Sequence, residues 1–252
     1  MKQKNFSILK STLSVCAIAI LAFACKTADP DTYSNDEEIY LNAKRKFLDE
    51  NYKKAASLID LLQLQYPASK YADDAQYLLA EINFADEQYL IAAFNYNRLI
   101  KNFPASEYVK EAMYKSSLCY YESSPSYDRD QTYTKQAIKA FQEFQYLYPQ
   151  DSLYSVAGEK IADMRDKLAH REFFNAELYR KLDSPISSIM YYDEVINNYG
   201  DTKYYEPAFF GKIETLNIIG YTEQLKALIP VYKATFPKGE HLDDVVSIEK
   251  DL

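Results

Sequence analysis

The apolar positions of this chain are organised in successive units, and five units end in an aromatic residue followed directly by proline or glycine. The five terminating pairs are Tyr66-Pro67, Phe103-Pro104, Tyr148-Pro149, Tyr199-Gly200 and Phe236-Pro237. A small residue lies twelve positions before the proline or glycine of each of the first four pairs, at Ala55, Ala92, Ala137 and Ser188. An alanine lies eight positions after the same proline or glycine, at Ala75, Ala112, Ala157 and Ala208. Because small side chains let antiparallel helices pack closely, this pattern predicts an internal helical repeat.

The repeat predicts five helical hairpins. The expected pairs are 37–50 with 52–66, 71–86 with 88–103, 108–122 with 132–148, 154–182 with 185–199, and 204–219 with 222–236. The third pair carries an inserted loop at 123–130, and the fourth begins with an unusually long helix. Pro230 is expected to kink or divide the last helix of the fifth pair. A short capping helix is expected near 242–251.

The spacing within the shorter units is similar to that of tetratricopeptide repeats. Ala43, Ala55 and Pro67 lie twelve residues apart, as do Ala80, Ala92 and Pro104. The predicted fold is therefore all-α, an α-solenoid of about five tetratricopeptide-like hairpins over residues 37–252. Units four and five depart from the spacing, since Gly200 replaces proline and Leu225 replaces a small residue.

The first residues have a different character from the rest of the chain. Three lysines precede an uncharged stretch from Ser11 to Ala24, which is shorter than a membrane-spanning helix but typical of a secretory signal. It ends in Leu21-Ala22-Phe23-Ala24-Cys25, which resembles a bacterial lipoprotein signal. We expect a signal peptide at 1–24, lipidation of Cys25, and a tether at 25–36. Secretion with Cys25 unmodified is the alternative, and Cys16 is a weaker lipidation candidate.

Charge and composition narrow the classes of function. Removing residues 1–24 would change the net charge from −8 to −11, because that segment contributes three lysines and no acids. An acidic body argues against nucleic-acid binding and against broad contact with anionic lipid. With five glycines and no rhythm of short turns, sandwich and Rossmann folds have little support. Tyrosine is abundant, at 25 copies. It suits helix–helix interfaces in which the ring is packed and the hydroxyl stays in contact with solvent.

Residues with catalytic or metal-binding chemistry are sparse. The two histidines, His170 and His241, lack metal-ligand spacing, and His170 is expected at the surface. Cys119 is expected to be a small core residue. No metalloprotease, phosphate-loop or nucleophile-elbow motif occurs, although a carboxylate pair is not excluded by counting. We therefore expect no enzymatic activity, metal, cofactor or small-molecule substrate.

Three stretches resemble the BamD family, lipoproteins of the outer-membrane β-barrel assembly machinery. They are 39–43 continuing to Tyr52 and Ala55, the loop 128–132 leading into Phe141, and the helix 166–172 continuing to Tyr179. With the lipoprotein-like start, the resemblance extends over nearly the whole chain after the signal.

This resemblance implies a non-catalytic scaffold anchored by lipid to the outer membrane and facing the periplasm. It further implies two partners: the barrel-inserting (BamA-like) subunit, bound mainly by C-terminal repeats, and unfolded outer-membrane proteins, received by N-terminal repeats through an extended segment.

Two series of aromatic residues are candidates for the client-peptide groove. Tyr40, Tyr77 and Tyr114 recur at intervals of 37, and Phe47, Phe84 and Tyr121 follow each by seven residues. Residues seven apart share a helix face, so stacked helices would form two aromatic rows. The alternative is that these rings are ordinary packing residues between helices.

The long fourth-unit helix carries candidate docking residues for a partner, namely Arg165, Lys167, Arg171 and Arg180, interleaved with acids. The alternative is a solvated face with i,i+4 ion pairs. Two rival functions also remain open. One is a periplasmic repeat lipoprotein that coordinates peptidoglycan work with outer-membrane constriction, and the other is a surface lipoprotein that binds glycans.

Overall fold

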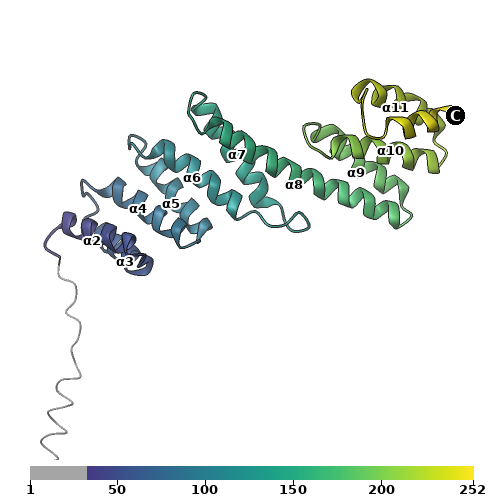
Figure 1. Ribbon diagram of the computed structural model, residues 1–252. Coiled ribbons are helices and arrows are strands. Elements are labelled where there is room, and N and C mark those ends of the chain that lie inside the picture. The colour runs from purple at the N-terminus through teal and green to yellow at the C-terminus, as the bar shows by residue number, and fades with distance from the viewer. Residues whose placement is uncertain (1–32) are drawn as a thin grey trace, which may run out of the picture.

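The computed structural model describes residues 33–252, which form eleven α-helices and contain no strand. Their bounds are α2 Asp36–Leu48, α3 Tyr52–Gln65, α4 Ala72–Ala85, α5 Tyr89–Asn102, α6 Val109–Glu122, α7 Thr132–Leu147, α8 Tyr154–Lys181, α9 Pro185–Asn198, α10 Tyr205–Ile218, α11 Thr222–Thr235 and α12 Leu242–Lys250. Consecutive helices pack as hairpins that follow one another along an elongated molecule (Figure 1). The predicted all-α solenoid of five hairpins is confirmed.

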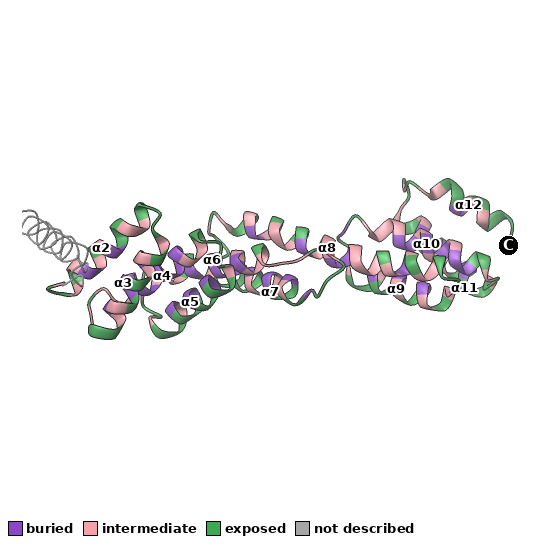
Figure 2. Cartoon of the chain, turned by 90° about the horizontal axis from the view of Figure 1, so that it is seen from below, coloured by how far each residue is buried: buried purple, intermediate pink, exposed green. Residues whose placement is uncertain are grey.

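Small residues at the repeated positions lie where helices meet. All eight residues that the spacing singled out before and after the terminating pairs are fully buried; they are Ala55, Ala75, Ala92, Ala112, Ala137, Ala157, Ser188 and Ala208. Buried positions follow the inner faces of the hairpins, and exposed positions cover the outside (Figure 2). Close approach of helix backbones therefore explains the repeat, because a larger side chain at these points would push the helices apart.

Pro230 does not divide its helix, although division was one of the two outcomes expected for it. The helix α11 is continuous from Thr222 to Thr235 with Pro230 inside it. Leu225 and Ile229 on one side of the proline and Tyr232 on the other are all buried in the same core cluster. Packing on both sides of the proline thus holds the two halves together, although its missing N–H removes one backbone hydrogen bond.

The tight turns within four hairpins share one backbone conformation. Glu50, Glu87, Asp183 and Gly220 each have positive φ, between 53° and 71°. The residue after each of them donates its backbone N–H to the carbonyl oxygen five positions earlier in the chain. One example is the hydrogen bond of 2.8 Å from Gln88 N to Asn83 O. This is the Schellman ending of a helix, in which a left-handed residue caps the last carbonyls. Only one of the four positions holds glycine, the residue that adopts this conformation without strain.

The helix α8 joins two parts of the solenoid (Figure 1). It has 28 residues, whereas α4 and α6 have 14 each. Its first half packs on α7, where Ala157 and Met164 share a core cluster with Phe141. Its second half packs on α9 and α10, where Ala176 shares a cluster with Tyr192. We call residues 33–164 the N-terminal array and residues 173–252 the C-terminal array.

Some tyrosine hydroxyls lie in the interior, which corrects the expectation that they stay wet. Tyr96, Tyr192 and Tyr232 are fully buried. Their hydroxyls donate to glutamates of neighbouring helices, Tyr96 to Glu81 and Tyr192 to Glu177. A buried hydroxyl needs such a partner because an unpaired polar group costs free energy. In residues 33–252 no helix combines the length and apolar character needed to cross a membrane.

Candidate partner-binding surfaces

The first aromatic row stacks between neighbouring repeats. Tyr40 of α2 stacks on Tyr71, with 4.9 Å between ring centroids, and Tyr77 of α4 stacks on Tyr108 at 4.3 Å. Asp74 accepts a hydrogen bond from the hydroxyl of Tyr108 at 3.0 Å and a longer one from Tyr40 at 3.5 Å. Burial and the neighbouring carboxylate raise the pKa of Tyr108 to about 12, so the hydroxyl keeps its proton. These rings tie three successive repeats together.

Tyr114, the third member of this row, packs differently. Its ring meets Phe141 and Phe144 of α7 edge-on, at centroid distances of 5.8 and 5.4 Å. The residue in the place of Tyr71 and Tyr108 at this junction is Leu153, which precedes α8. No ring is therefore available for the same stack, and Tyr114 packs against the other helix of its own hairpin.

The row continues into the C-terminal array, which the sequence analysis missed. Phe173 of α8 packs on Tyr204 at 5.5 Å, and Phe210 of α10 stacks on His241 at 4.1 Å. Phe173 lies three residues before the buried Ala176, as Tyr40 lies three before Ala43. The signal was present, since Ala176 precedes Ser188 by the repeat spacing of twelve residues.

Phe47 and Phe84, in the second row, contact their own hairpin partners. Phe47 lies 6.0 Å from Tyr52, and Phe84 meets Tyr89 edge-on at 5.4 Å. Tyr121, the third member, donates its hydroxyl to Asp163 of α8 at 2.8 Å. All six predicted groove residues are half-buried. Each residue therefore contributes to packing and remains partly accessible to solvent.

Arg165, a predicted docking residue, is engaged within the molecule. Its guanidinium donates to both carboxylate oxygens of Asp201, at 2.6 and 2.5 Å, and to the carbonyl oxygen of Asn198 at 2.7 Å. These contacts join α8 to the connection between α9 and α10. Both charged partners gain from the pair, so the pKa of Arg165 is raised and that of Asp201 is lowered.

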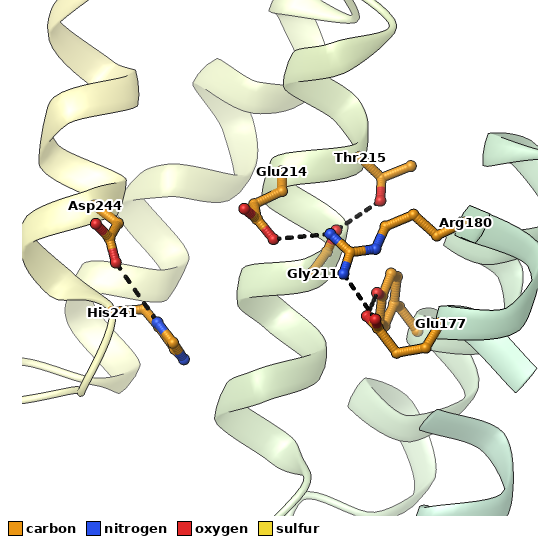
Figure 3. Close-up of polar contacts among 8 residues, drawn as sticks. Glu177, Arg180, Gly211, Glu214, Thr215, His241 and Asp244 are labelled. Atoms are coloured by element: carbon orange, nitrogen blue, oxygen red, sulfur yellow. Dashed lines mark hydrogen bonds and ion pairs between the residues drawn. The ribbon is translucent and has the colours of Figure 1, made fainter. Parts of the chain in front are cut away.

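Arg180 is engaged in the same way near the other end of α8 (Figure 3). It pairs with Glu177 of its own helix at 2.7 Å and with Glu214 of α10 at 3.2 Å. Beside it, the hydroxyl of Thr215 donates to the carbonyl oxygen of Gly211 at 2.7 Å. A Cβ at Gly211 would lie 2.4 Å from the ring of Tyr192, so this close packing requires glycine.

Lys167 and Arg171 face the inserted loop of the third hairpin. The ammonium of Lys167 donates to the hydroxyl of Ser124 at 2.9 Å, and burial lowers its pKa. Arg171 lies close enough to Asp130 to contribute to the lowered pKa of that carboxyl. Lys167 thus holds the inserted loop against α8, and the charge of Arg171 acts on the same loop.

His170 is not a simple surface residue, which corrects the expectation for it. Its ring stacks on Tyr204 at 5.1 Å and contacts Tyr127 of the inserted loop at 3.9 Å. Tyr127 also packs on Phe174. In the middle of α8, His170 therefore contacts both the inserted loop of the third hairpin and the residue that precedes α10. These contacts join the two arrays.

The inserted loop is held by a buried network. Gln131 is 2% exposed and donates to the carbonyl oxygens of Ser126 and Arg129, at 2.8 and 3.0 Å. Thr134 donates to Gln131 at 2.7 Å, and its hydroxyl contacts that of Ser124 at 2.6 Å. The loop and the long helix, two sequence features noted separately, thus form one structural unit.

Other reactive groups are few in the described chain. Cys119 is buried and unpaired, as expected of a core residue, and burial raises its pKa to about 12. Across residues 33–252, no group of three or more histidine, cysteine or acidic side chains could hold a metal ion. The expected lipidation site Cys25 lies outside the described residues.

The profile of the YfiO family, described as outer membrane lipoprotein, matches residues 32–228, which is more than half of the chain. The chain belongs to the YfiO (BamD) family. The match includes α2 to α10 and so contains the long helix and the inserted loop.

Three relatives carry the name outer membrane protein assembly factor BamD. The protein of Caulobacter vibrioides is 28% identical over 138 residues, and that of Rickettsia prowazekii 26% identical over 127 residues. These matches span 45% and 51% of those proteins, so the chain covers about half the length of each. The Neisseria gonorrhoeae protein is 24% identical over 257 residues, covering 93% of this chain and 94% of the relative.

Among solved structures, a thermophilic TPR protein of Thermus thermophilus is similar at a TM-score of 0.37 and 14% identity. The match covers 85% of this chain and 98% of that chain.

Proposed function

We propose that this chain is an assembly factor for outer-membrane β-barrel proteins, anchored to the outer membrane through a lipid on Cys25 and facing the periplasm. The observation that carries the proposal is the YfiO family match over residues 32–228. It is supported by the Neisseria relative, an assembly factor whose similarity extends over 93% of this chain. The cysteine after an uncharged stretch supports the lipid anchor.

The proposed mechanism is binding by two surfaces on one rigid support. The N-terminal array receives an extended segment of an unfolded outer-membrane protein, and the C-terminal array holds the barrel-inserting (BamA-like) subunit. The half-buried rings of α2, α4 and α6 support the first role, because aromatic edges give an extended peptide apolar contact. The stacks that fix these rings between repeats would reduce the entropy lost on binding.

The lipid and the partner are tested in intact cells. Crosslinking in intact envelopes, followed by purification and mass spectrometry, should recover a large β-barrel subunit and nascent outer-membrane proteins. Labelling with an alkyne fatty acid should mark the wild-type protein, and Cys25→Ala should abolish the label. Recovery of peptidoglycan enzymes in place of a barrel subunit would favour the envelope-constriction alternative. Cleavage by protease added to intact cells would favour a surface lipoprotein.

The client-peptide groove has its own test. Replacing Tyr40, Tyr77 and Tyr114 together with alanine should weaken binding of a peptide that ends in an aromatic residue. Because two of these rings stack between repeats, the urea midpoint of unfolding is measured for the same variant. A triple phenylalanine variant keeps the rings and serves as the matched control. Unchanged peptide affinity in a folded alanine variant would exclude the groove.

A further inference from the structure

A pocket opens between α8 and α9 in the C-terminal array. Its volume is about 420 Å³, and it is lined by Glu172, Tyr179, Ser187, Met190, Tyr191 and Glu194. Glu172 and Tyr179 are seven residues apart on α8, and the other four occupy one face of α9, so two helix faces form the walls. The aromatic rows and the ion-paired arginines described above take no part in it.

The length of α8 explains why only two helices line this pocket. A cleft in the N-terminal array is lined by three successive helices, with Asn97 from α5, Met113 from α6 and Lys139 from α7. The pocket between α8 and α9 is lined by these two helices only. The 14 additional residues of α8 correspond to about 21 Å of helix, which separates α9 from α7. The pocket between α8 and α9 therefore lacks the third wall that a helix provides in the N-terminal cleft.

Two carboxylates without a salt bridge face this pocket. Neither Glu172 nor Glu194 forms an ion pair with any described residue, whereas Glu177, on the same helix as Glu172, pairs with Arg180. Desolvation raises the pKa of Glu172, and the negative charge of Glu194 adds to the effect. Arg171, Lys135 and a hydrogen bond with Asn175 act in the opposite direction and offset only part of it. A further cation in the pocket would thus meet negative charge that Arg171 and Lys135 offset only in part.

The remaining walls suit a flat cation. The rings of Tyr179 and Tyr191 stack with 5.3 Å between centroids and 8° between planes. Such rings attract a cation placed over their faces. Met190, 67% exposed, provides a flexible apolar rim. A guanidinium combines planarity, weak hydration and paired donors for carboxylates, which an ammonium lacks.

We propose that this pocket binds an arginine side chain of a partner protein, with the guanidinium between Glu172 and Glu194 and against the stacked tyrosines. The assignment goes beyond the proposed function and does not rest on it, because the recognition chemistry is complete in the pocket itself. In this proposal the residues that contact the partner are acidic. The sequence alone had suggested the basic residues of α8 for that role.

The test uses methionine methyl groups as reporters in the full-length protein in detergent. Met113 lies in the cleft of the N-terminal array and Met164 in the core, so both are internal references for Met190. The capped peptide acetyl-Leu-Arg-Leu-amide is titrated against ¹³C-methyl-methionine protein, and the norleucine peptide acetyl-Leu-Nle-Leu-amide is the control ligand. The double variant Glu172→Gln/Glu194→Gln is compared with Glu159→Gln/Glu240→Gln, which makes the same charge change at exposed positions away from the pocket.

The arginine peptide should shift the Met190 signal saturably and leave those of Met113 and Met164 unchanged. Its affinity should fall at least tenfold in Glu172→Gln/Glu194→Gln and stay within twofold in the control variant. Equal binding of the norleucine peptide, equal affinity of the two variants, or no shift of Met190 would each overturn the proposal. None of these outcomes depends on whether the chain acts in outer-membrane assembly.

Discussion

The imidazole of His170 stacks on the ring of Tyr204, with 5.1 Å between centroids and 4° between planes. The two residues come from different hairpins, since His170 lies in the middle of α8 and Tyr204 directly precedes α10. Tyr127 of the inserted loop contacts the same imidazole, which makes this histidine the point where the two arrays are joined. Its protonation state therefore bears on the stability of this junction.

The first prediction concerns pH. Burial lowers the pKa of His170 below its ordinary value of 6.5, and the positive charge of Lys203 acts in the same direction. The unfolded chain consequently binds more protons than the folded one as pH falls below 6.5. The contribution of His170 is complete above that pH and is lost as pH falls through the lowered pKa. Urea midpoints measured between pH 7.5 and 5 should drop more for the wild type than for His170→Phe.

His170→Phe is the matched control because it keeps a ring between Tyr127 and Tyr204 and removes only the titration. Carboxylates titrate in both proteins and cancel in the comparison. Identical pH dependence of the two urea midpoints would contradict the prediction.

The second prediction concerns Gly211. An added Cβ would lie 2.4 Å from the buried ring of Tyr192, so Gly211→Ala forces that ring or one of the two helices to move. Overpacking of this kind costs roughly 1–3 kcal/mol of unfolding free energy. Gly200→Ala is the control, because its nearest atoms would lie at an ordinary 3.5 Å. Chemical denaturation followed by circular dichroism should give a lower unfolding midpoint for Gly211→Ala than for Gly200→Ala. Equal midpoints would contradict the prediction, because they would show that the added methyl group is accommodated without loss of stability.

The third prediction concerns the left-handed turn residues. Glu87 has φ of 58° and Gly220 has φ of 71° at equivalent turns. Glu87→Gly should raise the free energy of unfolding by about 0.5 kcal/mol, since relief of a strain of roughly 1–2 kcal/mol exceeds the entropy cost of glycine. Gly220→Ala should lower it by roughly 1 kcal/mol through backbone strain alone, since an added Cβ there meets no atom within 4 Å. Shifts of the same sign in both variants would refute this account.

The fourth prediction concerns the pair of Arg165 and Asp201. Their side chains are 28% and 55% exposed, so a double-mutant cycle to alanine should give a modest coupling energy of about 0.5–1 kcal/mol. The coupling should weaken in 1 M salt because exposed charges are screened. If Arg165→Ala left stability unchanged and abolished recovery of the barrel subunit, Arg165 would be a docking residue and not a structural one.

Much of the fold could be predicted from local signals. The helix bounds expected from the terminating pairs agree with the structure to within two residues, as in 71–86 against Ala72–Ala85. Pairing within hairpins also followed, because buried residues such as Ala80 and Ala92 recur at short, fixed distances. Pro230 was the exception, since contacts on both sides of it outweigh the local preference to break a helix.

The roles of single side chains were harder to predict. Sequence spacing placed Tyr40 and Tyr77 on equivalent helix faces, yet only the offset between hairpins decides that each meets a ring preceding the next hairpin. Arg165 and Arg180 were predicted as docking residues, with ion pairs along the helix as the alternative. Their contacts with Asp201 and Glu214 could not be predicted, because these acids lie 36 and 34 residues away in the chain. Contacts at such separations depend on the superhelical path, which short-range patterns do not contain.

The amino-acid sequence by itself determined the all-α repeat, the hairpin boundaries and the unusual length of α8, because these follow from local helix-ending residues and from small residues at fixed spacing. Only the tertiary structure decided that His170 joins two arrays and that Glu172 and Glu194 face an uncovered pocket. The physical reason is that a longer helix moves the next hairpin away from the preceding one, and the faces thus left open depend on three-dimensional packing.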